Sequence, residues 1–153
     1  MAVEKRVLLA RPHAFIVNQM RPFLLEAGYT PVGTQSLDHL AQALSGSFHG
    51  AIISTAVSST VNVDAATVFR LVREKLPRLP IVFAGMADAA TMKLSAERAV
   101  KALVSTPTIA SPQDMRMASG SDRSSTFLVL RKEDLMPGGS QEAALRALRT
   151  LFG

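Results

Sequence analysis

The sequence predicts a single α/β domain, residues 1–153, with a doubly wound, mostly parallel five-stranded sheet and an extra edge strand as an alternative. Short apolar runs alternate with segments in which apolar residues recur every three or four positions, the pattern of strands and amphipathic helices. The central runs are apolar throughout, as in parallel strands buried on both faces. Helices of about a dozen residues between the strands allow right-handed crossovers, which place helices on both faces of the sheet.

The first unit of this pattern is a strand at residues 6–10 followed by a helix at Ala14–Ala27. Pro12 ends the strand because it lacks a backbone donor, and Gly28 supplies a left-handed helix end. Pro22 lies inside the helical pattern. We therefore expect either a kink one turn before it or a helix that restarts with Pro22 in its first turn.

The next unit is less apolar and lies nearer a sheet edge. Pro31 interrupts a short strand at residues 29–34, and proline is tolerated mainly in edge strands. Ser36 is the expected N-cap of a helix at residues 37–44. Gly50–Ser54, which is apolar through its middle, is the third strand and belongs in the centre of the sheet.

Two further units follow the third strand. Asp64 is the expected N-cap of a helix at residues 65–76, whose apolar stripe has charged residues on the opposite side. Residues 79–84 form the fourth strand, and Ala89–Val100 the fourth helix. Residues 101–106, which are closed by a proline, are a candidate fifth strand.

The last part of the chain is less regular, with an irregular insertion at about residues 108–139. Within it, the apolar run at residues 126–130 either adds an edge strand or replaces residues 101–106 in the sheet. Gln141–Phe152 has a wide apolar stripe, so we expect this helix to dock on the flank of the sheet.

Composition excludes several kinds of site. The chain has no cysteine, which excludes disulfides, thiol nucleophiles and cysteine-bound metals, and its three histidines show no metal-ligand spacing. A dinucleotide site needs a Gly-rich turn after the first strand, where this chain has Ala10-Arg-Pro-His13. We therefore expect no metal and no cofactor. No run reaches the roughly 18 apolar residues of a membrane helix, so we expect no membrane insertion and a cytoplasmic protein.

The net charge is +5, and basic residues concentrate between positions 70 and 101. They are Arg70, Arg73, Lys75, Arg78, Lys93, Arg98 and Lys101. Such a cluster either attracts an anionic partner or forms an ordinary solvated helix face. With one tyrosine and no tryptophan, the chain offers little surface for stacking bases, so nucleic acid is not the expected partner.

Several stretches have the order and spacing of one known family. They are residues 7–15 with the helix end at 24–28, the strand Gly50–Ser54, the pair Ala84-Gly85, and the pair Thr106-Pro107. Residues 6–107 therefore resemble the receiver domain of response regulators. The resemblance implies a flavodoxin-like, receiver-like fold and a context of two-component signal transduction.

The residues that carry phosphorylation in receivers are replaced here. The resemblance places Arg11 and Pro12 at the family's acidic pair, Ser54 at its phospho-accepting Asp, Ala84 at its Thr or Ser, and Thr106 at its Lys. Phosphorylation of a receiver needs a carboxylate nucleophile, magnesium held by further carboxylates, and a cation for the phosphoryl oxygens. We therefore predict a degenerate pseudo-receiver with no catalytic residue and no metal.

Two functions remain as hypotheses. The first is a non-enzymatic, phosphorylation-independent signalling or scaffolding module that acts through a protein partner or through self-association. The alternative is an α/β domain, enzymatic or not, that binds a small ligand or an anion at the carboxyl ends of the strands through Arg11, His13, Ser54 and Thr106. For an anion or a protein partner, the candidate contacts are Arg11, His13, Arg146 and Arg149.

Overall fold

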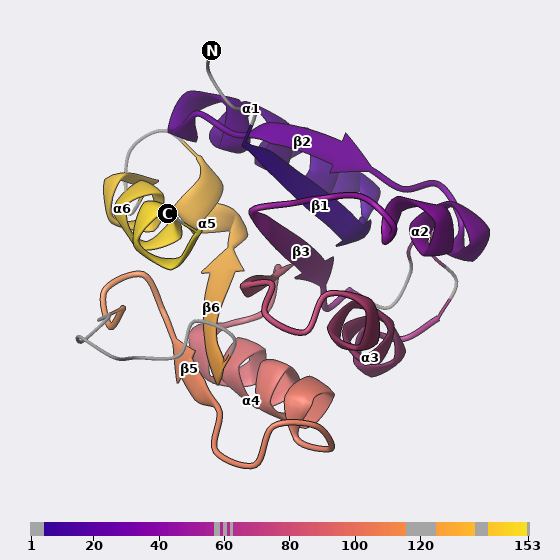
Figure 1. Cartoon of the computed structure of the whole chain (residues 1–153). Coiled ribbons are helices and arrows are strands. Elements are labelled where there is room, and N and C mark those ends of the chain that lie inside the picture. Colours follow the sequence, from indigo (N-terminus) through magenta and orange to yellow (C-terminus); the bar gives the residue numbers. More distant parts are fainter. Residues whose placement is uncertain are drawn as a thin grey trace.

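The structure is a computed structural model that describes residues 5–56, 59, 61, 63–115, 125–136 and 141–152. Its elements alternate between strands and helices over most of the chain (Figure 1). In chain order they are β1 (Arg6–Arg11), α1 (Ala14–Ala27), β2 (Thr30–Gly33), α2 (Leu37–Ala43), β3 (Gly50–Ser54), α3 (Ala65–Lys75), β4 (Ile81–Gly85), α4 (Ala89–Val100), β5 (Thr108–Ala110), β6 (Thr126–Arg131), α5 (Lys132–Leu135) and α6 (Gln141–Phe152).

The strands form one parallel sheet in the order β2-β1-β3-β4-β6-β5 across the described residues. β1, β3, β4 and β6 lie in the interior of the sheet and are almost wholly buried, whereas β2 and β5 are its edges. The predicted fold class is confirmed, and the strand near Pro31 is an edge strand as expected. A sixth strand is present, but it is β5 and not the predicted run at residues 126–130, which lies inside the sheet as β6.

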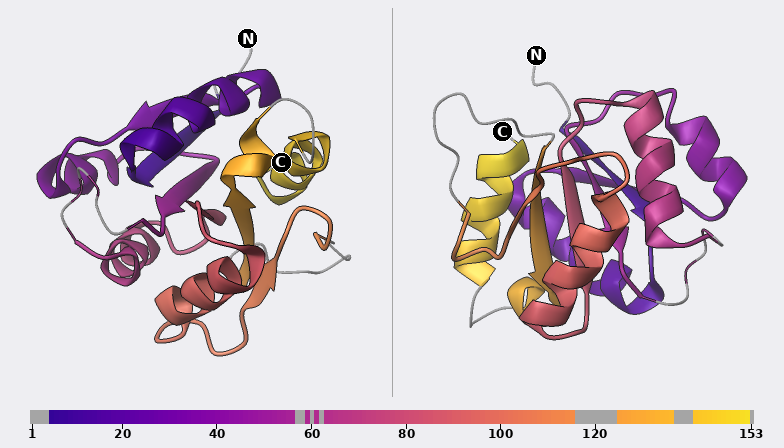
Figure 2. Two further views of the ribbon diagram at one scale, coloured as in Figure 1. Left: turned by 180° about the vertical axis from the view of Figure 1, so that it is seen from behind. Right: turned by 90° about the horizontal axis from the view of Figure 1, so that it is seen from below.

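Helices cover both faces of the sheet (Figure 2). On one face, side chains of α1, α5 and α6 form a core with every second residue of the strands. On the other face, α2, α3 and α4 form a second core, which contains the ring contacts of Phe69, Phe83 and Phe127. The connections from β1 and β3 therefore leave the sheet on opposite faces.

The candidate strand at residues 101–106 is wrong. After α4 the chain continues in a turn, in which the amides of Leu103 and Val104 both donate to the Val100 carbonyl, and most of these side chains are exposed. The strand beside β4 is instead β6, in which Phe127 and the next three residues are buried. An interior strand needs a continuous apolar run, and residues 127–130 supply one where residues 101–106 do not.

The ends of the helices follow the capping signals. The side chains of Ser36, Asp64 and Asp88 each accept a hydrogen bond from a backbone amide in the first turn of α2, α3 and α4. Gly28 ends α1 at a φ of 94°, in the left-handed region. Pro22 lies inside α1, which continues to Ala27, so the helix does not restart at this proline.

The C-terminal helix docks on the sheet as predicted. α6 buries Ala144, Leu148 and Leu151 in the core that it shares with α1. Phe152 packs on the edge of the Tyr29 ring, with centroids 5.7 Å apart, and fills the space beside Gly50, where a Cβ atom would overlap its ring. Of the proposed insertion, residues 116–124 and 137–140 lie outside the described residues, and β5, β6 and α5 lie within it. No helix among the described residues is long and apolar enough to cross a membrane.

Candidate functional site

The carboxyl ends of β1 and β3 are the place in this sheet where a ligand is expected. In open parallel sheets ligands bind beyond the carboxyl ends of the strands, at the point where successive connections leave on opposite faces. That point lies between β1 and β3, because α1 covers one face and α3 the other. Arg11 ends β1 and Ser54 ends β3, so two of the predicted site residues are brought together here.

Arg11 fills this position with its own side chain. Its Nη1 donates to the carbonyls of Ser54 at 2.7 Å and Ala56 at 2.6 Å, and its Nε donates to the carbonyl of Val63 at 2.7 Å. The residue is only 4% exposed. The pairing of β1 with β3 shifts register just before Arg11, and irregularities of this kind change the direction of a side chain at a strand end. The guanidinium therefore crosses the end of β3 and holds the connection to α3.

The charge of Arg11 is surrounded mainly by carbonyl oxygens. Burial lowers the pKa of Arg11 from its usual value, and the nearby carboxylate of Asp64 opposes that shift. An arginine stays charged in proteins, so the cation is permanent. Carbonyl oxygens are also ligands of hard metal ions. Here they bind a guanidinium, and no group of three or more metal-ligating side chains occurs in the described part of the chain.

Ser54 is committed to the turn that follows β3. The residue is 1% exposed, and its Oγ accepts a hydrogen bond from the Ala56 amide at 3.0 Å. Its carbonyl accepts from Arg11. A serine nucleophile needs an adjacent base and access to its substrate. The arrangement provides neither, because the hydroxyl is enclosed and its hydrogen-bond neighbour is a backbone amide.

The end of β4 is also filled. The amide of Thr55 donates to the carbonyl of Ala84 at 2.9 Å, and the Thr55 hydroxyl lies 3.4 Å from Sδ of Met92. A Cβ atom at Gly85 would overlap the Thr55 Oγ1 and would lie 2.7 Å from the Met92 sulfur. Glycine is therefore required for this close approach of Thr55 and Met92 to the end of β4.

Thr106 is not at the carboxyl edge of the sheet, which is the border formed by the carboxyl ends of the strands. It lies beside Ser125, the residue before β6, and so belongs to the opposite edge of the sheet. The residue that ends the strand beside β4 is Arg131, which pairs with Gly85. Its amide donates to the carboxylate of the buried Asp134 at 2.8 Å, and its Nε lies 3.6 Å from Glu133. Residues 101–106 form no strand, so Thr106 does not end one. Arg131 could have been found from the sequence, because it is the basic residue that directly follows the apolar run 127–130.

The remaining predicted contacts do not join this site. His13 is half-buried at the N-terminus of α1, and its Nδ1 makes no hydrogen bond with any described residue. Arg146 and Arg149 are exposed on α6, as the helical pattern predicted. The Nε of Arg149 donates to the Ala27 carbonyl at 3.4 Å, whereas Arg146 lines a depression beside Met115.

A cavity opens at the carboxyl edge, between α1 and the end of β2. It has a volume of about 370 Å³, and its lining includes Asn18, Arg21, Thr34 and Gln35. Nη2 of Arg21 lies 2.8 Å from where a Cβ atom of Gly33 would be, so the guanidinium rests directly on the strand backbone. Sequence reasoning missed this arginine, because the contact depends on a glycine in another element.

No protein-family profile matches the chain, and no curated protein matches it either. Solved structures do match. A response regulator receiver protein from Sinorhizobium medicae WSM419 is 18% identical with a TM-score of 0.58, and the alignment covers 97% of this chain and 94% of that one. The signal receiver domain of an HD domain-containing protein from Pseudomonas fluorescens Pf-5 is 15% identical with a TM-score of 0.60, over 97% and 94% of the two chains. The receiver domain of a sensor histidine kinase from Pseudomonas aeruginosa PAO1, solved with magnesium in its active-site cleft, is 12% identical with a TM-score of 0.57, over 99% and 100%.

The chain has the receiver fold. Folds of this type have five strands in the order 2-1-3-4-5. In this chain β6 takes the place of the fifth strand, and β5 is added outside it. Arg131 ends the strand that takes this place, and Arg11 and Ser54 end β1 and β3.

Proposed function

We propose that the protein is a phosphorylation-independent signalling or scaffolding module that acts through contact with another protein. The observation that carries this proposal is the Arg11 guanidinium, which binds three carbonyls at the carboxyl ends of β1 and β3. Ser54 ends β3 with a buried hydroxyl instead of a carboxylate. The receiver fold is retained around a position that is occupied by a side chain of the protein itself.

The chemistry of aspartyl phosphorylation does not fit these residues. The acceptor must be a carboxylate, and magnesium must be held by oxygen ligands that bear negative charge. A divalent cation within about 4 Å of a buried guanidinium is repelled, and more strongly than in water because the surroundings are less polar. The buried Ser54 hydroxyl hydrogen-bonds to the Ala56 amide, which cannot act as a base. The proposal therefore assigns the protein no enzymatic activity.

Incubation with acetyl phosphate and magnesium tests this proposal. Intact-protein mass spectrometry is expected to show no phosphoryl adduct on the natural chain. The matched comparison is the double variant Arg11→Asp with Ser54→Asp, which restores two carboxylates and keeps Arg131. A stable adduct on the natural chain that is lost with hydroxylamine, as acyl phosphates are, would overturn the proposal.

A second candidate function rests on the cavity beside Arg21. The Arg21 guanidinium forms no hydrogen bond or ion pair with the described residues. Asn18 and Gln35 line the same cavity. Arginine with neighbouring amides suits a carboxylate or phosphate group. Calorimetric titration with inorganic phosphate and with succinate checks this function, because binding that Arg21→Met abolishes would favour it over the first.

A further inference from the structure

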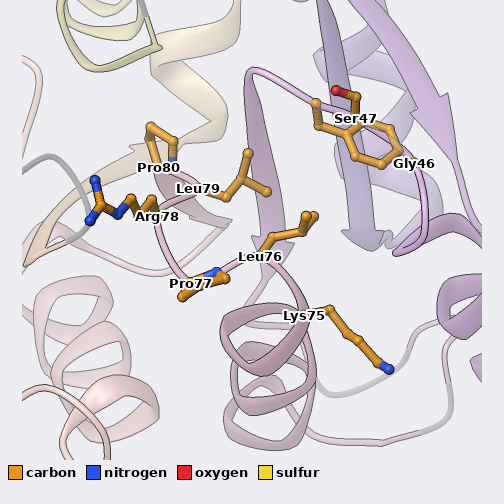
Figure 3. Close-up of a pocket in the computed structure, with 9 residues that line it drawn as sticks. Gly46, Ser47, Lys75, Leu76, Pro77, Arg78, Leu79 and Pro80 are labelled. Carbon is orange, nitrogen blue, oxygen red and sulfur yellow. The ribbon is translucent and has the colours of Figure 1, made fainter.

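The edge of the sheet opposite Arg11 carries a depression that the proposed function does not use. We call this border the amino edge. In a parallel sheet it contains the starts of the strands and the C-terminal ends of the helices that precede them. The depression lies between the connection from α2 to β3 and the connection from α3 to β4, and its volume is about 450 Å³ (Figure 3). It is lined by Gly46, Ser47, Phe48, Lys75, Leu76, Pro77, Arg78, Leu79 and Pro80.

The floor of this depression is apolar. Leu76 and Leu79 turn toward its middle, between Lys75 on one side and Arg78 on the other (Figure 3). Leu79 is buried, and Leu76 and Phe48 are half-buried, so two apolar side chains are partly open to a ligand. Burial of such surface against a partner contributes roughly 25 cal/mol for each Å² that is removed from water.

The rim of the depression is basic. Lys75 and Arg78 are exposed, and neither forms an ion pair with any residue that the structure describes. Arg6 joins them, because its guanidinium stacks on the Phe48 ring at 4.7 Å and its Nη1 donates to the Ser47 carbonyl at 3.5 Å. Cations at this edge are favoured by the negative ends of the helix dipoles. Three cationic groups thus surround one apolar surface.

The fold divides the basic cluster of the sequence between the two edges. Lys93 points to the carboxyl edge, where its Nζ pairs with Asp114 at 3.0 Å. Arg98 and Lys101, at the end of α4, share the amino edge with Lys75 and Arg78. Four members of the basic cluster therefore lie at the edge that has the apolar floor.

From this arrangement we infer that the depression is a docking site for an acidic peptide segment of a partner protein, with one large apolar side chain on Leu76 and Phe48 and carboxylates beside Lys75, Arg78 and Arg6. This inference deepens the proposed function, since it names the surface and the chemistry of the partner. Charge complementarity selects the acidic segment and steers its approach.

Two other occupants fit less well. A small ligand is usually buried over roughly 70–90% of its surface, which an open depression of this kind does not achieve. Single-stranded nucleic acid is bound by stacking on several exposed aromatic rings, whereas the lining residues include one aromatic ring, that of Phe48, which is half-buried. A peptide that lies across the rim can bury one side chain and leave its backbone in water.

Peptide selection tests the inference on the full chain. A phage library of random dodecapeptides is panned against the immobilised protein at low salt, and enriched peptides are synthesised for titration into isotope-labelled protein. We expect sequences that combine Asp or Glu with Leu, Phe or Trp. The amide shifts are expected at Gly46, Ser47, Lys75, Leu76 and Leu79.

Charge-reversal variants identify the site. The double variant Lys75→Glu with Arg78→Glu is expected to weaken binding at least tenfold, while the control Arg70→Glu with Lys132→Glu, which carries the same change in net charge, keeps it within twofold. Binding is also expected to weaken as salt is raised, because the rim charges are exposed.

Several results would contradict the docking site. They are no enrichment, enriched peptides without acidic residues, shifts at another surface, or equal loss in both double variants. Tighter binding of a random single-stranded RNA at the same amides would assign the depression to nucleic acid instead. Failure here leaves the phosphodonor experiment unaffected, because that experiment reads only the chemistry at Ser54 and Arg11.

Discussion

The two edges of the sheet use positive charge in opposite ways. At the carboxyl edge, Arg11 is buried and donates to three backbone carbonyls. At the amino edge, Lys75 and Arg78 are exposed, and neither forms an ion pair with a described residue. The same kind of group therefore has a structural role at one edge and is available to a partner at the other.

The difference follows from solvation. A buried cation is tolerated only when its hydrogen bonds are made within the protein, and its removal leaves acceptors without donors. An exposed cation keeps its water and contributes little to folding, but it remains free to pair with an incoming anion. Burial thus predicts which charges a variant can lose without unfolding the chain.

The largest expected effect is the loss of the buried cation. Arg11→Met leaves the carbonyls of Ser54, Ala56 and Val63 without their donor, and we expect the free energy of unfolding to fall by about 2–4 kcal/mol. Urea denaturation followed by circular dichroism measures it. Arg78→Met at the other edge is the matched control and is expected to change stability by no more than about 0.5 kcal/mol. Equal costs for the two variants would erase the distinction between the edges.

The next largest effect is expected when a methyl group is added to a glycine, because the two edges differ in how closely their glycines are packed. A methyl group at Gly85 overlaps Thr55 and Met92, so we expect Gly85→Ala to cost about 1–3 kcal/mol through overpacking. At the amino edge, the nearest atom to a Cβ of Gly46 is the Ala43 carbonyl oxygen at 3.2 Å. Gly46→Ala is therefore expected to stay within about 1 kcal/mol of the natural chain, since the lower entropy of its unfolded state offsets the tight contact. Thermal unfolding of both variants decides whether the carboxyl edge is as closely filled as described.

Acid is expected to weaken the carboxyl edge alone. Hydrogen bonds from Thr67 lower the pKa of Asp64, and hydrogen bonds from Thr91 lower that of Asp88, where these carboxylates cap α3 and α4. A depressed pKa in the folded state gives stability that is present above the unfolded value of about 3.9 and is lost as pH falls through the folded value. We expect Tm to fall by a few degrees between pH 5 and pH 3.

The control for this titration is Asp64→Asn, which keeps a capping side chain without the charge. It is expected to make Tm less dependent on pH over the same interval. A pH dependence that is unchanged in Asp64→Asn would show that this cap is not its source.

The smallest expected effect is that of magnesium, which we expect to cause no change. Magnesium titrated to millimolar concentrations should leave the amide shifts of residues near Arg11 and Ser54 unchanged, because the guanidinium occupies the converging carbonyls. The double variant Arg11→Asp with Ser54→Asp is the comparison in which we expect saturable shifts. Saturable binding to the natural chain would mean that the carboxyl edge still accepts a cation from solution.

The sequence predicted some elements of this fold better than others, depending on how clear their apolar and capping patterns are. The strands and helices from β1 to α4 were predictable because strands that are buried inside a sheet consist of apolar runs. Ser36 and Asp64 also mark the starts of two helices, since both residue types are common N-caps. The interior strand beside β4 was ambiguous, since two apolar segments competed. Burial resolves that ambiguity, as Phe127 and its neighbours are enclosed while residues 101–106 are not.

The candidate site was less accessible to sequence reasoning. The positions of Arg11 and Ser54 at adjacent strand ends followed from the strand order. The partners of Arg11 did not, because they are backbone carbonyls in a connection that any residue type could supply. The contact of Arg21 with Gly33 and the depression beside Leu76 likewise depend on how separate elements meet in space.

The two outer strands limit how this protein can meet other chains. β2 contains Pro31, which has no amide hydrogen to offer, and β5 is only three residues long. Short or proline-containing borders of a sheet give an approaching strand few hydrogen-bonding groups to template on. We therefore expect this domain to resist strand addition and amyloid-like stacking, and to engage its partners through side chains on its helices and connecting turns.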